Sequence, residues 1–281
     1  MKVMADVLVN TDWVAQHATD AGVRVVEVDV DTGSYDQGHV PGSAGWNWTT
    51  ELCDTLVRDI VPAKKLEELL GKSGIDNKTT IVLYGDNNNW FAAWAFWQLK
   101  VYGHDDVRIM DGGRKKWLAE GRDLTTDKAS FTATTYKAGA PDLSLRAFLP
   151  EVQQAVAGKK AALVDVRSPQ EFSGERTHMA EYPQEGVLRG GHIPGAKNVP
   201  WARAANPEDG TFKDAAGLRA IYENEIGLKP EDDVIAYCRI GERSSHTWFV
   251  LTYLLGYKRV RNYDGSWTEW GNAVGMPIER P

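Results

Sequence analysis

The sequence predicts an α/β protein with two domains in tandem, each built around a mostly parallel sheet flanked by helices. Three observations support this prediction: a length of 281 residues, a set of motifs that recurs at one offset, and short apolar runs that alternate with helical patterns. One domain takes about 150 residues, so the length suits two. Hydrophobic residues make up 42% of the chain and charged residues 25%, which is ordinary for a globular protein and argues against disorder, collagen or coiled coil.

The recurring motifs indicate a tandem duplication. The segment Gly-His-Val-Pro-Gly at Gly38–Gly42 returns as Gly-His-Ile-Pro-Gly at Gly191–Gly195, 153 positions later. Further markers keep this offset without a net insertion: Trp48 and Trp201, Gly74 and Gly227, Tyr84 and Tyr237, Gly103 and Gly256, Asp111 and Asp264, Trp117 and Trp270. A period of this length is that of a domain rather than of a solenoid repeat.

The duplication sets the expected domain boundaries. We expect a first domain at residues 1–124, a linker without helical period at 125–144, and a second domain at 145–281. Upstream the offset falls to 136, because Val28-Asp29 matches Val164-Asp165. The second half therefore carries 17 extra residues within 166–190, which form either a polar surface loop or a loop beside the active site.

The expected elements alternate between strand and helix in each half. Short apolar runs suit parallel strands that are buried on both faces, and they lie at Val25–Val30, Thr80–Tyr84, Ala161–Val166 and Val234–Tyr237. Helical patterns lie at Pro62–Leu70, Asn89–Tyr102 and Ser244–Leu255, each followed by a glycine that favours helix termination. In sheets of this type, ligands bind beyond the carboxyl ends of the strands.

Charge and cysteine content exclude several classes of protein. A net charge of −7 argues against a general nucleic-acid binder and against attachment to an anionic membrane. The two cysteines, Cys53 and Cys238, are too few for a disulfide framework or a four-thiolate zinc site. Without an apolar run of signal-peptide or membrane-spanning length, we expect a cytoplasmic protein with reduced thiols. The sequence leaves its oligomeric state open.

Cys238 has the surroundings of a reactive thiol. It directly follows an expected strand and precedes an expected helix, in the stretch Cys238-Arg239-Ile240-Gly241-Glu242-Arg243-Ser244. A helix N-terminus, free backbone N–H groups and neighbouring cations all lower the pKa of a thiol from about 8.5, so we expect a thiolate at neutral pH. Cys53 lacks such neighbours and is expected to be an ordinary thiol.

The residues around Cys238 suit a small anion. Arg239 and Arg243 supply guanidinium groups that bind oxyanions, and Gly241 lets a short loop curl around its first residue. Ile240 and Ser244 complete the expected lining, whereas Glu242 opposes an anion and is expected to point away and to pair with an arginine. The first half places Gly85, Asp86 and Trp90 where Cys238, Arg239 and Arg243 stand, which predicts a catalytically silent copy.

These motifs together resemble the rhodanese sulfurtransferases over nearly the whole chain. The resemblance lies in Asp165-Val166-Arg167-Ser168, the Gly191–Ala196 segment, the six-residue loop that opens with Cys238, and Asp264-Gly265-Ser266-Trp267. It implies two rhodanese-like domains, the first silent, and a persulfide on Cys238 that moves the sulfane sulfur of thiosulfate to cyanide or a small thiol without metal or other cofactor. Thiosulfate enzymes of the family resemble Cys-Arg-x-Gly-x-(Arg or Thr), which Cys238–Arg243 matches.

Two alternative functions remain open. Mercaptopyruvate enzymes tend to have Gly at the place of Arg239 and Thr at that of Arg243, and a persulfide carrier would pass its sulfur to a protein partner. Some thiosulfate enzymes carry Lys in place of Ile240 and Arg in place of Glu171, so Arg243 is expected to take over part of their role. A cysteine phosphatase is disfavoured, because its loop needs five residues between Cys and Arg and only four stand here.

Three further residues lie near the expected site. Asp165 and Arg167 fall at the end of a neighbouring strand, and they either brace the loop or reach the substrate; a structural ion pair is the simpler interpretation. His192 is expected to be structural, because its counterpart His39 is kept in the silent half.

Overall fold

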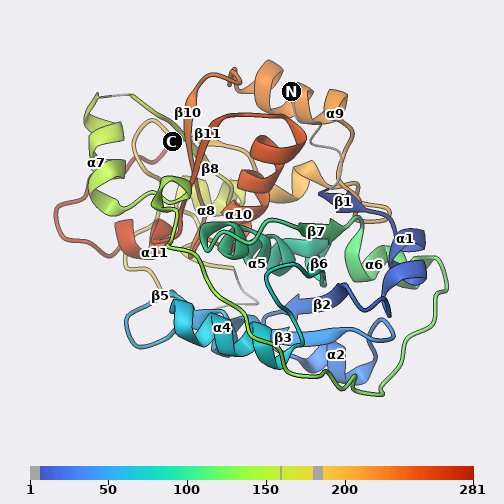
Figure 1. Cartoon of the computed structure of the whole chain (residues 1–281). Helices are drawn as coiled ribbons and strands as arrows, with labels where there is room; N and C mark the ends of the chain where they lie inside the picture. Colours follow the sequence, from blue (N-terminus) through green and yellow to red (C-terminus); the bar gives the residue numbers. More distant parts are fainter. Residues whose placement is uncertain (1–6, 159, 180–185) are drawn as a thin grey trace. The chain divides into compact units, whose positions relative to one another are not determined.

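The computed structural model describes residues 7–158, 160–179 and 186–281 (Figure 1). They fall into two compact units, one made of Met1–Asp142 with Ala205–Phe212 and the other of Leu143–Ala204 with Lys213–Pro281. Both units carry a parallel sheet flanked by helices, which confirms the predicted α/β class. Residues 180–185 of the predicted insertion lie outside the described residues.

The first unit is built on a five-stranded sheet with the order β1-β7-β6-β2-β3. All its neighbouring strands pair in parallel: β1 (Leu8–Val9), β2 (Val23–Asp29), β3 (Ala44–Asn47), β6 (Thr80–Tyr84) and β7 (Val107–Met110). A separate antiparallel hairpin consists of β4 (Cys53–Asp54) and β5 (Asp59–Ile60). The helices are α1 (Thr11–His17), α2 (Gly33–Gln37), α3 (Trp48–Glu51), α4 (Ala63–Lys72), α5 (Trp90–Val101), α6 (Gly113–Ala119) and the 3₁₀ turn η1 (Asn87–Asn89).

The second unit repeats this plan on a four-stranded sheet with the order β11-β10-β8-β9. Its parallel strands are β8 (Ala162–Asp165), β9 (Lys197–Asn198), β10 (Asp233–Tyr237) and β11 (Arg259–Tyr263). Its α-helices are α7 (Leu149–Gly158), α8 (Pro169–Ser173), α9 (Ala215–Arg219), α10 (Glu242–Phe249) and α11 (Ser266–Trp270). Two short 3₁₀ turns are η2 (Leu143–Leu145) and η3 (Trp201–Ala204), and two π-helical turns are η4 (Ala220–Glu225) and η5 (Val250–Leu254).

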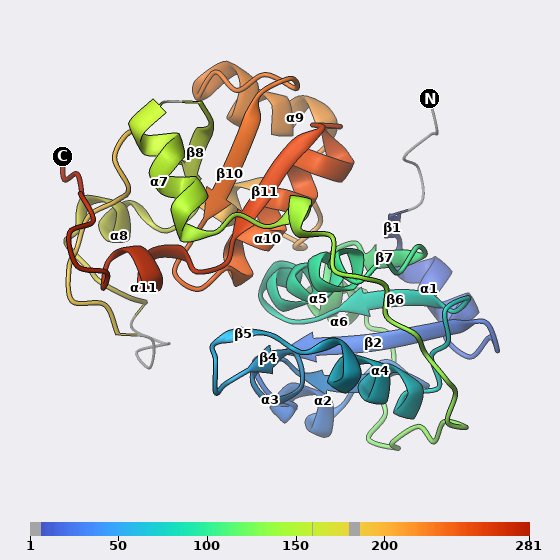
Figure 2. The same ribbon diagram turned by 60° about the vertical axis from the view of Figure 1, so that its left-hand side comes forward.

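The strand register of the second unit brings three loops to one edge of the sheet. Tyr237, the last residue of β10, pairs with Tyr263 on β11 and with Asp165 on β8. The carboxyl ends of the three strands are therefore level, and the loops that follow them begin side by side. α10 packs against β10 and β11, as Figure 2 shows, and so its N-terminus faces the same edge.

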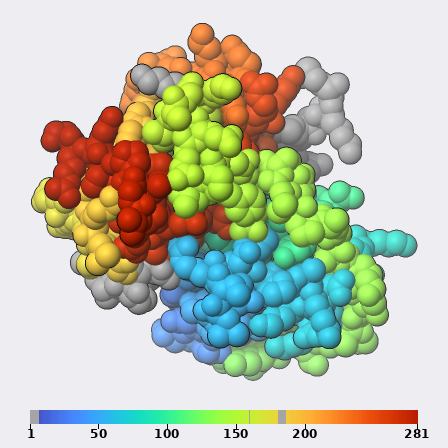
Figure 3. Space-filling view, turned by 90° about the vertical axis from the view of Figure 1, so that its left-hand side faces the viewer, coloured from blue at the N-terminus to red at the C-terminus, as the bar shows by residue number. Residues whose placement is uncertain are grey.

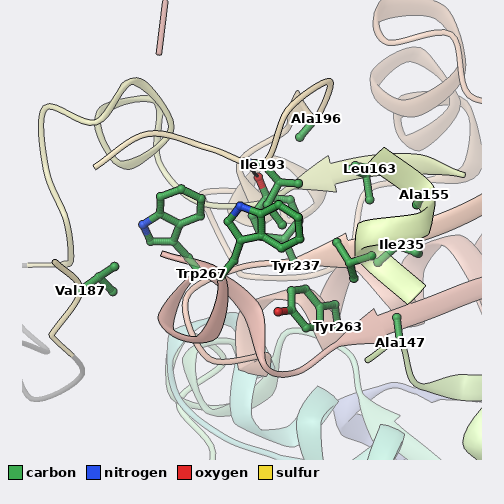
Figure 4. Close-up of a cluster of buried hydrophobic side chains, with 12 residues drawn as sticks. Ala147, Ala155, Leu163, Val187, Ile193, Ala196, Ile235, Tyr237, Tyr263 and Trp267 are labelled. Atoms are coloured by element: carbon green, nitrogen blue, oxygen red, sulfur yellow. Dashed lines mark hydrogen bonds between the residues drawn. The ribbon is translucent and has the colours of Figure 1, made fainter. Parts of the chain in front are cut away.

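A buried cluster holds this edge of the sheet in place. Figure 4 shows Ile235 and Tyr237 of β10 among side chains from the neighbouring strands, α7 and α11. The Tyr237 hydroxyl accepts a hydrogen bond from the Ile193 N–H at 3.1 Å, and in the first unit Tyr84 accepts one from the Val40 N–H at 3.0 Å. These matching bonds explain why the tyrosine and the Gly-His-x-Pro-Gly segment keep one offset.

Two helix ends differ from the sequence expectation. α4 continues through Gly71 to Lys72, because Gly74, with φ at +68°, supplies the left-handed residue after the helix. The expected helix Ser244–Leu255 begins earlier, at Glu242, and changes from α- to π-helical winding at Val250.

The expected linker runs along the first unit. Between Thr125 and Asp142 it contains no regular helix or strand, and Figure 3 shows these yellow-green residues on the surface beside α4. The Ala138 N–H donates to the Glu67 carboxylate at 3.0 Å, and the Lys137 N–H donates to the Asn77 side chain at 3.0 Å. The buried Tyr136 adds an apolar anchor. Contacts, rather than helix or strand, thus order this segment.

The ends of the insertion in the second half, at Gly174 and Gly191, lie against each other. A Cβ on Gly174 would lie 2.7 Å from the Gly191 nitrogen, so the chain beyond Gly174 comes back against it. α8 precedes this point, as α2 precedes Gly38 in the first unit. The stacked pair Phe172–His192 matches Tyr35–His39 across the insertion, and each histidine Nδ1 contacts the carbonyl oxygen of its stacking partner. This repeated packing fits a structural His192.

Candidate active site

Cys238 opens a tight loop between β10 and α10. Gly241 adopts a φ of +102°, which is strained for any residue with a side chain, and Glu242 begins the helix. This curl turns the Gly241 N–H onto the Cys238 Sγ at 3.1 Å. The structure thus has the strand, loop and helix that the sequence predicts, with a backbone donor aimed at the sulfur.

The expectation of a thiolate is wrong for this state of the loop. Cys238 is 0% exposed, and its Sγ donates to the Glu242 Oε2 at 3.2 Å. Burial raises the pKa of the Cys238 thiol, the negative charge of Glu242 raises it further, and Arg243 and the Ser244 N–H only partly oppose this. A helix N-terminus is not sufficient when the thiol is fully dehydrated beside a carboxylate.

The sequence predicted that Glu242 points away from the thiol, and this prediction is wrong: its Oε2 contacts the Cys238 Sγ. Its side chain is buried under the loop, with one oxygen on the sulfur and the other 3.7 Å from the Arg243 Nε. The expected approach to an arginine is present, but so is a contact with the nucleophile itself.

Arg243 is held from the opposite side by Glu171. Its Nη1 and Nη2 donate to the two Glu171 oxygens at 2.9 and 3.0 Å, and both side chains are buried. Burial acts to raise the pKa of Glu171, but the hydrogen bonds and charge of Arg243 outweigh it and lower this pKa to about 2. The cationic charge of Arg243 is therefore balanced within the protein before any substrate binds.

Glu171 is fixed by its place on α8. Ser168 caps this helix, its hydroxyl accepting from the Glu171 N–H, while the Glu171 carboxylate accepts from the Ser168 N–H in a capping box. The fork to Arg243 uses the same carboxylate. The segment 166–190 thus contributes a residue beside the active site, and the extra residues follow it after Gly174.

Asp165 and Arg167 form the buried ion pair that the simpler interpretation predicted. The Arg167 Nε lies 3.0 and 3.1 Å from the two Asp165 oxygens, and its Nη2 also donates to the Gly191 carbonyl at 2.8 Å. The guanidinium carbon lies 4.6 Å from the centre of the Trp267 ring. The pair connects the end of β8 to the Gly-His-Ile-Pro-Gly segment and to α11. These contacts stabilise the edge of the sheet at which the Cys238 loop begins.

Sequence reasoning missed the role of Ser266. Its hydroxyl accepts from the Cys238 N–H at 3.1 Å and donates to the Tyr263 carbonyl at 2.6 Å. Its φ is +54°, the same left-handed value that its counterpart Gly113 adopts in the first unit. A serine at a position that suits glycine was the available signal.

A second support that the sequence did not reveal comes from Asn262 on β11. The Ser244 hydroxyl donates to the Asn262 Oδ1 at 2.6 Å, and the Asn262 Nδ2 donates to the Gly241 carbonyl at 3.0 Å. The Trp267 N–H donates to the Cys238 carbonyl at 3.1 Å and the Thr268 N–H to the Arg239 carbonyl at 2.9 Å. The loop is therefore held by two neighbouring elements.

Of the remaining predicted residues, Arg239 and Ile240 lie in the loop and Ser244 lies in the first turn of α10. Arg239 and Ile240 are buried at 3% and 8% exposure, as is the predicted lining residue Ser244. Cys53 lies in the β4–β5 hairpin of the first unit and forms no disulfide.

Comparison with known proteins identifies the fold. The family described as "Rhodanese-like domain" matches the chain twice, over residues 10–120 and 149–273. The chain belongs to the rhodanese family. The predicted tandem arrangement is confirmed, and this rhodanese pair places Cys238 in the second matched segment.

Curated relatives of this rhodanese are similar over almost their full length. It is 56% identical over 278 residues to "Sulfur carrier protein TtuD" of Thermus thermophilus, covering 98% of this chain and 97% of that one. It is 55% identical over 276 residues to "Putative thiosulfate sulfurtransferase" of Saccharopolyspora erythraea, with 98% and 97% covered. These relatives confirm the prediction of a sulfurtransferase-type enzyme.

Solved structures agree with this assignment. An "anaerobic ergothioneine biosynthesis enzyme" from Chlorobium limicola superimposes with a TM-score of 0.83 at 25% identity, covering 98% of this chain and 70% of that one. The structure named YnjE gives a TM-score of 0.83 at 26% identity, with 98% and 68% covered. The helices of the described residues are all too short or too polar to cross a bilayer.

Proposed function

We propose that this rhodanese transfers the sulfane sulfur of thiosulfate to cyanide or a small thiol through a persulfide on Cys238. The observation that carries this proposal is the curled loop around Sγ, whose Gly241 N–H lies 3.1 Å from the sulfur. Backbone donors of this kind stabilise a negative charge that develops at a fixed position. Arg239 and Arg243 on the same loop favour an anionic donor.

The reaction takes place in two displacements. The Cys238 sulfur attacks the outer sulfur of thiosulfate, a new S–S bond forms, and the old S–S bond breaks with its electron pair leaving on sulfite. The acceptor then attacks the outer sulfur of the persulfide, and Cys238 leaves as a thiolate. Splitting one transfer into two substitutions at the transferred sulfur, with Cys238 as leaving group in the second, is the usual advantage of covalent catalysis.

Thiosulfate is favoured over mercaptopyruvate by the loop's two arginines. The Glu171 fork occupies both terminal nitrogens of Arg243, so Arg243 contributes by charge and by orienting the loop. Arg239 is then the loop cation that we assign to the departing sulfite. A reducing compartment such as the cytoplasm would keep the Cys238 thiol reduced between turnovers.

A sulfur carrier that delivers to a protein is the second candidate function. The relative of Thermus thermophilus at 56% identity bears the name of a sulfur carrier. The same persulfide would form, but turnover with small acceptors would be slow. The acceptor therefore separates the two proposals, whereas the chemistry at Cys238 is common to both.

The test is mass spectrometry combined with donor assays. Thiosulfate should add about 32 Da, one sulfur atom, to Cys238 and leave Cys53 unmodified. Cys238→Ser should abolish thiocyanate formation, and Cys53→Ser, the matched control, should retain it. Faster turnover of mercaptopyruvate or p-nitrophenyl phosphate than of thiosulfate would contradict the donor assignment, and an adduct on Cys53 alone would contradict the site. Rapid persulfide formation without turnover to cyanide or thiols would favour the carrier.

A further inference from the structure

Glu242 is a buried carboxylate with a hydrogen bond from the Cys238 thiol and a longer ion-pair contact with Arg243. It is 1% exposed, its Oε2 accepts from the Cys238 Sγ at 3.2 Å, and within the described residues its Oε1 has no hydrogen-bond partner. Glu171, the other carboxylate of the site, is satisfied by Ser168 and by the fork to Arg243. Burying a carboxylate without full hydrogen bonding is energetically unfavourable, so its place against the nucleophile calls for a chemical role.

The proposed reaction supplies a task for this carboxylate. The Cys238 thiol is protonated in the buried loop, so its proton must leave before or during the attack on thiosulfate. A proton acceptor has to lie within hydrogen-bond reach of the thiol, and Glu242 Oε2 does. Departing sulfite in turn accepts a proton near neutral pH.

The other charged groups around the loop are engaged elsewhere or carry the wrong charge for this task. Arg239 and Arg243 are cations, Glu171 is paired with Arg243, and Asp165 is paired with Arg167. His246 on α10 packs edge-on against Trp201, with ring centres 5.2 Å apart. Arg243 faces the relevant carboxylate with its Nε, which lies 3.7 Å from the Glu242 Oε1.

We propose that Glu242 is the catalytic proton relay of persulfide formation in this enzyme. Its carboxylate takes the proton from the Cys238 thiol as the sulfur attacks thiosulfate, and its carboxylic acid then returns that proton to the departing sulfite. Thiol, carboxylate and thiosulfate thus become persulfide anion, carboxylate and hydrogen sulfite, with the same atoms and charge on both sides. This inference rests on the proposed function of Cys238.

The relay also eases an electrostatic conflict in the loop while sulfite departs. A carboxylate 3.2 Å from Sγ would repel the persulfide anion that forms on that sulfur. As long as Glu242 holds the proton, it donates a hydrogen bond to the forming anion; after the proton passes to sulfite, the Gly241 N–H, 3.1 Å from Sγ, still faces the persulfide. Glu171 has an indirect part: it fixes the far side of Arg243, and Arg243 positions Glu242.

The experiment compares Glu242→Gln and Glu242→Asp with the wild-type enzyme in single-turnover persulfide formation over a range of pH. The amide can still accept a hydrogen bond but cannot take a proton, so we expect a rate loss of about 10²-fold or more near neutral pH. The rate of this variant should rise steadily with pH as hydroxide replaces the relay. The aspartate keeps a proton acceptor at shorter reach and should give an intermediate rate with a pH profile like that of the wild type.

Glu269→Gln is the matched control. Glu269 lies on α11, and its Oε2 accepts from the Tyr263 hydroxyl at 2.7 Å, a bond that an amide oxygen can keep. We expect its rates and pH profile to match those of the wild type. Thermal unfolding of all variants separates a loss of fold from a loss of proton transfer.

The outcomes distinguish the relay from the function on which it rests. Equal rates and equal pH profiles for the wild type and Glu242→Gln would overturn the relay, and so would an equal loss in the Gln and Asp variants. If the Gln variant does not fold, the Asp variant alone decides, because a profile that rises with pH like uncatalysed thiol ionisation would exclude a carboxylate relay. If the wild-type enzyme forms no Cys238 adduct at any pH, the proposed function itself fails.

Discussion

The two repeats share one framework but differ at the point where the central strand ends. In the second, Cys238 opens a loop that curls around its own sulfur. In the first, Gly85 stands at this position, and a Cβ there would lie 2.4 Å from the Val28 carbonyl oxygen and 2.9 Å from the Asp29 Oδ1. The first repeat has therefore lost the space for a cysteine as well as the cysteine itself. A single back-substitution would not restore the site.

The two repeats also differ in the electrostatics of the buried carboxyl groups near the carboxyl ends of their central strands. In the first repeat, burial and the charge of Asp86 raise the pKa of Asp29 to about 8. Burial also raises the pKa of Glu27 to about 7, although Tyr84 and Arg114 oppose it. In the second repeat, each of two buried carboxylates has an arginine fork, Asp165 with Arg167 and Glu171 with Arg243. The first repeat thus keeps Asp29 and Glu27 with raised pKa values even though Glu27 contacts Arg114 at 3.0 Å, whereas in the second repeat the arginine fork to Glu171 lowers the pKa of that carboxyl.

The largest loss of stability should come from Glu171→Gln, which removes the bidentate counter-ion of the buried Arg243 and leaves it the longer contact with Glu242. Removing one partner of a buried pair costs about 3–5 kcal/mol of unfolding free energy. We expect a loss of this size near neutral pH, measured by urea denaturation. Glu225→Gln is the control, because its pair with Arg203 in the same unit is solvent-exposed, and it should leave stability unchanged.

The same carboxylate predicts a pH dependence. The folded-state pKa of Glu171 is lowered to about 2 from 4.5, so its stabilising contribution is present above the unfolded value and is lost as the pH falls from there through the folded value. The stability difference between the wild type and Glu171→Gln should shrink over that acidic range. A difference that stays constant would show that Arg243 does not depend on the ionised carboxylate.

A smaller change in stability, and a gain rather than a loss, is expected from Asp29→Asn in the silent repeat. Its pKa is raised from 3.8 to about 8, so the stabilising contribution is fully present below the unfolded value, declines as the pH rises from there, and is lost above about 8. The amide mimics the protonated acid, so the variant should be more stable than the wild type at alkaline pH by on the order of 1–2 kcal/mol. Asp105→Asn, at an exposed position of the same unit, should show no such gain. Reduced alkaline stability of Asp29→Asn would argue that the carboxylate is paired.

The smallest effect should follow from Ser266→Gly, which gives the active repeat the residue of Gly113. The glycine relieves the left-handed φ but removes the hydroxyl that accepts from the Cys238 N–H. These terms are each about 1 kcal/mol and oppose one another, so stability should change little while kcat/KM for thiosulfate falls about tenfold. An unchanged kcat/KM would show that the backbone of Cys238 is positioned without Ser266.

Local patterns in the sequence predicted much of the fold and the centre of the site. Apolar runs located β6 at its observed bounds and β2, β8 and β10 to within two residues. The fixed offset between the repeats identified the duplication, and the position of Cys238 between a strand and a helix identified the nucleophile. These features depend on the order of residues along the chain, which a sequence displays directly.

The contacts that set the chemistry depend on residues far apart in the sequence, and only the tertiary structure decided them. Glu171 reaches Arg243 across 72 positions, and Ser266 reaches the Cys238 N–H across 28. Glu242 is close in sequence, but its direction follows from the burial of the whole loop, which also raises the pKa of the thiol that the local pattern predicted to be ionised. A sequence shows which charges are neighbours along the chain; dehydration and counter-ions, which determine their ionisation, arise only when the chain is folded.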